Sequence, residues 1–88
     1  MKLIAASNMC PAGNGTRAFR VILYSREHDF EPYVVHYEAE EGDRWQGDYC
    51  ASIAEAAAEF ERRCKSWGLH DAAVREVWSN EAADWVGV

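Results

Sequence analysis

The chain has 88 residues, with 15 acidic against nine basic side chains and a formal net charge of −6 at pH 7. This length is that of one small domain. The acidic balance argues against direct binding of DNA, RNA or an anionic membrane, because such binding depends on Lys and Arg side chains that neutralise phosphates. It permits a basic protein as partner.

Residues 1–17 predict a flexible N-terminal arm before the folded domain, which we expect over residues 18–88. The segment Ser7–Thr16 is rich in turn-forming residues. The apolar run near the N-terminus is too short for the core of a signal peptide, and no apolar run has the length of a transmembrane helix. We therefore expect a cytoplasmic protein. The sequence leaves open whether its start is Met1 or Met9.

Three segments show the alternating side-chain pattern of β-strands and predict an antiparallel meander. They are Phe19–Arg26, Tyr33–Glu40 and Arg44–Cys50. Glu41–Asp43, with a central glycine, is typical of a hairpin turn. Gly47 predicts a β-bulge or the close approach of another backbone. The solvated face of the second strand is expected to carry Val34, His36, Glu38 and Glu40.

Residues 52–67 have the clearest pattern in the chain and predict a helix. Ser52 and Glu55 form an S-x-x-E capping box, and Gly68 is suited to the left-handed stop after the last turn. Glu59 and Arg63 are spaced as a favourable i,i+4 ion pair. An apolar stripe is expected to pack on one face of the sheet and consists of Ile53, Ala57, Phe60, Cys64 and Trp67.

Residues 70–88 are compatible with two structures. Asp71 can cap a short helix, or Val74–Ser79 and Asp84–Val88 can form a hairpin around a turn at Asn80–Ala83. The β-branched and aromatic residues of this segment favour the hairpin. The expected fold class is therefore α+β: a three-stranded antiparallel meander, one helix packed on one face, and a C-terminal β-hairpin or short helix.

Four carboxylates gather around the predicted hairpin turn and are the first candidate site. They would present an anionic surface to a basic groove, in a manner compatible with imitation of nucleic-acid phosphates. The alternative is a solvated turn that keeps the protein soluble. The four residues are Glu38, Glu40, Glu41 and Asp43.

Aromatic residues on the predicted strands are the second candidate site. Tyr33, Tyr37 and Trp45 are of the types that anchor protein interfaces. A stacking platform for single-stranded RNA is disfavoured, because interleaved Lys and Arg are lacking. The alternative is that some of these rings belong to the core beneath the helix.

No cofactor, metal site or catalytic residue is expected. His28, Asp29, Glu31 and His36 match no spacing of known metal ligands. Cys50 with a histidine would need an oriented base and an oxyanion hole, and the sequence indicates neither. The chain has three cysteines without a C-x-x-C pair, so reduced thiols are expected.

In size and composition the chain resembles phage-encoded inhibitors of host defence, including anti-CRISPR proteins, which are small, acidic and aromatic-rich domains without catalytic motifs. The resemblance implies a non-enzymatic module that binds a basic, nucleic-acid-binding protein or complex stoichiometrically. One alternative is a homodimeric structural or regulatory domain that pairs through its aromatic face or edge strand. The less favoured alternative is a metal-binding or catalytic domain that uses His28, His36 and Cys50.

Overall fold

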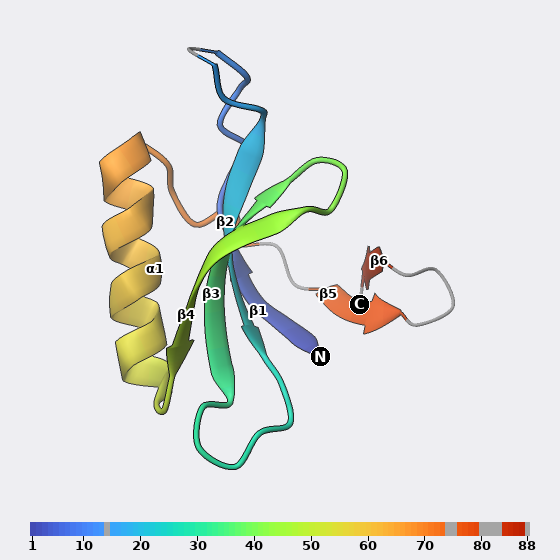
Figure 1. Ribbon diagram of the computed structural model, residues 1–88, viewed down its shortest axis with the longest axis vertical. Helices are drawn as coiled ribbons and strands as arrows, with labels where there is room; N and C mark the ends of the chain where they lie inside the picture. Colours follow the sequence, from blue (N-terminus) through green and yellow to red (C-terminus); the bar gives the residue numbers. More distant parts are fainter. Residues whose placement is uncertain (14, 74–75, 80–83, 88) are drawn as a thin grey trace.

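An antiparallel sheet and one helix form two layers, so the fold is α+β (Figure 1). The structure is a computed structural model that describes residues 1–13, 15–73, 76–79 and 84–87, the last two by their backbone. Within these residues the strand order is β4-β3-β2-β1-β5-β6, with every neighbouring pair antiparallel. The elements are β1 (Lys2–Ala6), β2 (Phe19–Ser25), β3 (Tyr33–Ala39), β4 (Arg44–Cys50), α1 (Ile53–Trp67), β5 (Glu76–Ser79) and β6 (Asp84–Gly87).

The strand β1 corrects the prediction of a three-stranded meander. It lies between β2 and β5, pairs with both, and makes the meander four-stranded. The arm predicted over residues 1–17 therefore begins with a central strand. Both faces of β1 are buried, with Ala5 toward α1 and Leu3 and Ala6 on the opposite side, so its sequence lacks the alternation that marks a half-solvated strand. Mobility of the remainder of the arm stays a prediction.

The strands β2, β3 and β4 confirm the predicted segments to within one residue at each end. The bulge predicted at Gly47 is also confirmed, because the pairing of β3 with β4 shifts register between Val35 and Tyr37. Gln46, next to the glycine, has a φ of 52°. The ring of His36 lies so close to Gly47 that an added Cβ would be 2.9 Å from its Cδ2 and closer still to Nε2.

Both ends of α1 form as predicted. The Ser52 hydroxyl accepts the backbone N–H of Glu55 at 3.2 Å. Gly68 has a φ of 66°, and the Leu69 N–H reaches the carbonyl of Cys64 at 2.8 Å, which is the hydrogen bond of a Schellman stop. Among the described residues, no helix has both the length and the apolar character needed to cross a membrane.

The buried face of α1 differs from the predicted stripe. Phe60 and Cys64 are buried as expected, but Ile53 and Trp67 are each 45% exposed, and Arg63 is buried with 5% exposure. The helix contacts β2, β3 and β4, so it covers one end of the sheet. Ile53 consequently lines an open groove on the side of α1 that faces β1.

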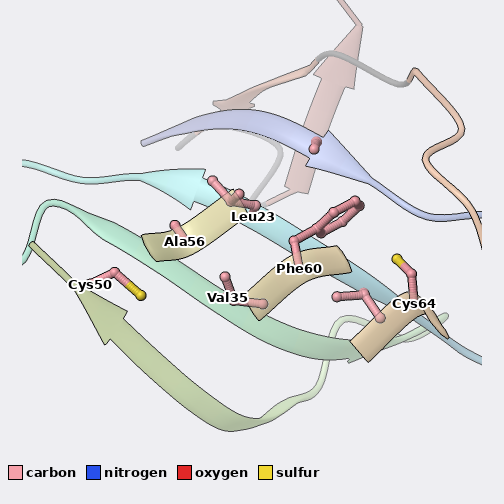
Figure 2. Packing of buried hydrophobic residues seen from close by; sticks show 8 residues of the cluster. Leu23, Val35, Cys50, Ala56, Phe60 and Cys64 are labelled. Carbon is pink, nitrogen blue, oxygen red and sulfur yellow. The ribbon is translucent and has the colours of Figure 1, made fainter. Parts of the chain in front are cut away.

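A buried cluster between α1 and the sheet forms the main core. Small helix residues let the helix approach the sheet closely, and Phe60 fills the space above β2 (Figure 2). The buried residues of this cluster are Ala5, Val21, Leu23, Val35, Cys50, Ala56, Phe60 and Cys64.

The sheet face away from α1 is not the solvated face that the alternation of β3 predicts. It has its own buried cluster, and the guanidinium carbon of Arg44 lies 5.2 Å from the ring centre of Tyr24, so a long polar side chain covers apolar surface. In Figure 1 the hairpin β5–β6 and α1 lie on opposite sides of the meander. The buried residues of this face are Leu3, Ala6, Ile22, Tyr24 and Val34.

The C-terminal segment forms the hairpin and not the short helix. β5 pairs with β6 over Glu76–Ser79 and Asp84–Gly87, and Val77 of β5 is the register partner of Lys2 in β1. The hairpin thereby extends the sheet beyond β1. The turn predicted at residues 80–83 lies outside the described residues, as do the predicted strand ends at 74–75 and 88.

We predict that Gly47→Ala lowers the free energy of unfolding by about 1 to 3 kcal/mol, because the new Cβ overlaps the His36 ring. Gly13→Ala is the matched control, since its Cβ would meet nothing within 4 Å, and it should change the free energy by at most about 0.5 kcal/mol. Urea unfolding followed by circular dichroism measures both. Equal stability of the two variants would contradict the close packing at Gly47.

Candidate functional site

Four aromatic side chains meet where the start of β2, the end of β3, the start of β4 and the last turn of α1 come together. The buried ring of Phe19 lies edge-on to three others, with centroid distances of 5.5 Å to Tyr37, 6.0 Å to Trp45 and 5.0 Å to Trp67. Tyr37 and Trp45 are cross-strand partners 5.9 Å apart. The Trp67 indole N–H donates to the Tyr37 hydroxyl at 3.3 Å. We call these four residues the aromatic cluster.

A cavity of about 130 Å³ lies among the rings of the aromatic cluster, and Thr16 and Gln46 complete its lining. Sites for small-molecule ligands usually measure about 300 to 1,000 Å³. The cavity is therefore of a size for part of one side chain. Phe19 is buried, whereas Tyr37 and Trp45 are half-buried and Trp67 is 45% exposed, so the rings remain accessible to a partner.

Two guanidinium groups lie over rings of the cluster. The Arg17 Cζ is 5.3 Å from the ring centre of Trp45, and the Arg63 Cζ is 4.7 Å from that of Tyr37. Both distances fall within the range of cation–π attraction. The buried Arg63 donates through Nε to Glu59 Oε2 at 2.6 Å, while its Nη1 has no hydrogen-bond partner among the described residues.

The turn between β3 and β4 places three exposed carboxylates beside Trp45. The Gly42 N–H donates to the Ala39 carbonyl at 2.9 Å, and Gly42 has a φ of 96°, which suits glycine. The Arg17 Nη1 donates to Glu41 Oε1 at 2.5 Å and to Asp43 Oδ2 at 2.8 Å. The hydrogen bond to Asp43 is the main cause of the raised pKa of Arg17. We call Glu40, Glu41 and Asp43 the acidic turn.

Glu38, predicted to face the partner, is not part of this surface. Its side chain lies on the sheet face away from α1 and is buried with 5% exposure. Oε1 accepts from Arg20 Nε at 3.1 Å and Nη2 at 2.9 Å, and Oε2 accepts from Arg44 Nε at 3.0 Å. These ion pairs join β2, β3 and β4. The position corrects the expectation of an exposed carboxylate at Glu38.

Of the three predicted aromatic anchors, the structure brings together Tyr37 and Trp45. Tyr33 lies at the other end of β3, where it is the register partner of Cys50 and packs against the helix-side core. Sequence reasoning missed Phe19 and Trp67 as members of the site, although both carried a signal as apolar residues directed at the helix–sheet interface. Arg17 carried no signal, because it belongs to the segment interpreted as an arm.

The residues of the metal-binding or catalytic alternative lie apart. His28 Nδ1 accepts two backbone N–H groups of its own loop, at 2.9 and 3.2 Å. His36 is paired with the Tyr24 hydroxyl at 3.0 Å, and burial lowers its pKa. Burial raises the pKa of the Cys50 thiol, which disfavours the nucleophilic thiolate. In the described part of the chain, no group of three His, Cys, Asp or Glu side chains has the arrangement of a metal site.

An open groove of about 630 Å³, mainly apolar in its lining, runs between α1 and β1. Ile4 and Leu23 belong to its sheet side, and Ile53, Ala57 and Phe60 to its helix side. It lies on the side of α1 toward β1, because the helix contacts β2, β3 and β4 and is not centred over β1. The groove is separate from the aromatic cluster, since Phe60 lines the groove and not the cavity among the rings.

Comparison with protein-family models, with curated proteins and with solved structures finds no match to this chain. The site is therefore interpreted from its own geometry and charges.

Glu59 stabilises the aromatic cluster indirectly, because its hydrogen bond with Arg63 holds that guanidinium against the ring of Tyr37. Its carboxylate accepts from Arg62 at 2.7 and 2.6 Å and from Arg63 at 2.6 Å. These hydrogen bonds, with that of Arg62 the largest cause, lower the pKa of Glu59 from 4.5 to about 2. A lowered folded-state pKa contributes stability that is present above pH 4.5 and is lost as the pH falls toward 2.

We predict that Glu59→Gln makes unfolding less dependent on pH. Between pH 6 and pH 3 the wild type should lose about 2 kcal/mol at this position, because the unfolded chain takes up a proton that the folded chain does not. Free energies of unfolding in urea at both pH values test the difference. Glu61→Gln, an exposed neighbour on α1, is the control. The same pH dependence in wild type and Glu59→Gln would rule out this role for Glu59.

Proposed function

We propose that the chain is a non-enzymatic protein-binding module that acts stoichiometrically as an inhibitor or regulator of a basic protein or complex. This is the mode of action of the phage-encoded anti-defence proteins that it resembles in size and composition. The observation that carries the proposal is the position of the acidic turn directly beside the aromatic cluster, linked by Arg17.

The aromatic cluster has the properties of an interface anchor. Trp and Tyr are enriched among residues that dominate binding energy, above all where rings are held in place before binding. Phe19 packs edge-on against Tyr37, Trp45 and Trp67, and the cavity among them has the size for part of one partner side chain. Binding would therefore need little reordering of these side chains.

The acidic turn supplies electrostatic attraction. Glu40 is exposed, and Glu41 and Asp43 have side chains that are 52% and 66% exposed. Together with the net charge of −6, these carboxylates would steer a basic surface toward the cluster and raise the association rate. Such attraction between exposed charges is screened by salt, so binding should weaken as ionic strength rises.

We predict that reversing Glu40 and Glu41 together to Lys weakens binding of the partner by about tenfold at low salt and by less at high salt. A tagged chain first captures the partner from cell extract, and the purified partner is then titrated by isothermal calorimetry. The matched control reverses Asp29 and Glu31 to Lys in the β2–β3 loop, at the opposite end of the sheet (Figure 1). It alters the net charge by the same amount.

Two outcomes would contradict the role of the acidic turn. One is unchanged affinity in the Glu40/Glu41 variant. The other is equal weakening in the control variant at Asp29 and Glu31, which would mean that net charge alone governs binding and that the turn beside the aromatic cluster has no special part in it.

A second candidate is a homodimer, favoured by the open apolar groove and by Ile53 on its rim, which is 45% exposed. If the groove pairs two copies, Ile53→Arg should convert a dimer into a monomer at micromolar concentration, because the interface would have to bury a charge. Light scattering of both proteins measures this. A monomeric wild type at that concentration removes the candidate.

A further inference from the structure

We infer that Arg17 is an internal occupant of an arginine-binding site formed by Trp45, Glu41 and Asp43, and that an arginine side chain of the partner takes its place. The inference rests on the proposed function and deepens it, since it names the group of the basic partner that the surface recognises. The contacts of the Arg17 guanidinium with Trp45, Glu41 and Asp43 define the site.

Three contacts converge on this one guanidinium. Its Cζ lies 5.3 Å from the ring centre of Trp45, and its Nη1 donates to Glu41 at 2.5 Å and to Asp43 at 2.8 Å. A ring face for the planar cation and carboxylates for its N–H groups are the features by which proteins recognise arginine. The chain thus contains both the receptor and a bound example of its ligand.

The occupant is replaceable because the site is open to solvent. The side chains of Arg17, Glu41 and Asp43 are 53%, 52% and 66% exposed. Exposed ion pairs are weak and screened by salt, so exchange of one guanidinium for another disturbs the fold little. By contrast, Arg63 over Tyr37 is buried and hydrogen-bonded to Glu59, and a partner cannot reach it in the same way.

Arg17 also reduces charge repulsion within the acidic turn. It bridges carboxylates on either side of Gly42, which would otherwise repel one another. Because it is tethered to the site, it competes with any free arginine at a high effective concentration. Removing its guanidinium should therefore open the site and tighten the binding of an external one.

The test titrates N-acetyl-arginine amide into wild type, Arg17→Ala and Arg17→Gln, and follows the Trp45 indole N–H by two-dimensional NMR. N-acetyl-citrulline amide, which has a similar shape without charge, is the matched control probe. Both variants should bind the arginine probe with a Kd about two- to sixfold lower than that of wild type. The citrulline probe should shift the signal little in any of the proteins.

Reversal of Glu41 and Asp43 to Lys in the Arg17→Ala background should abolish the response to the arginine probe. The inference is overturned if the folded Arg17 variants bind the probe no more tightly than wild type, or if citrulline binds as well as arginine. Failure here with an intact, salt-dependent capture of the partner would leave the proposed function standing. Loss of partner binding by the Glu40/Glu41 reversal is measured separately, so the two results are distinguishable.

Discussion

The edge-on packing of Phe19 against three rings is the interaction on which the proposed surface depends. Phe19 begins β2, and its partners come from β3, β4 and the last turn of α1. One buried ring therefore joins the helix to the hairpin at the end of the sheet where Glu41 and Asp43 lie. Because the position of Trp45 is set by this packing, the acidic turn and its neighbouring ring are held in a fixed relation before any partner binds.

Several charged side chains of the sheet and the helix are paired within the fold, so they do not form part of the surface left for a partner. Glu38 joins three strands through two arginines, and Glu59 holds Arg63 over the ring of Tyr37. The acidic turn differs, because its carboxylates are exposed and their cation, Arg17, is itself exposed. Composition alone could not separate these groups, since it counts every carboxylate equally whatever its burial.

The elements with strong local signals were predictable, whereas those set by distant packing were not. The caps of α1 and the bulge at Gly47 depend on interactions between residues close in sequence, and both form as predicted. β1 is recognised only by its position between β2 and β5. In the site, the proximity of Tyr37 and Trp45 could be predicted from the pairing of neighbouring strands. Arg17, in contrast, contacts Glu41 and Asp43, which lie 24 and 26 residues away in sequence.

Arg17, Trp45 and the acidic turn form one arranged surface in the free protein. Nuclear Overhauser effects between the δ protons of Arg17 and the indole protons of Trp45 test it most directly, since they require that the side chains be neighbours in solution. We expect these contacts at low salt, with the δ protons shifted upfield by the ring, and weaker contacts at high salt. Arg17 δ protons at random-coil positions, without contacts to Trp45 at low salt, would contradict it.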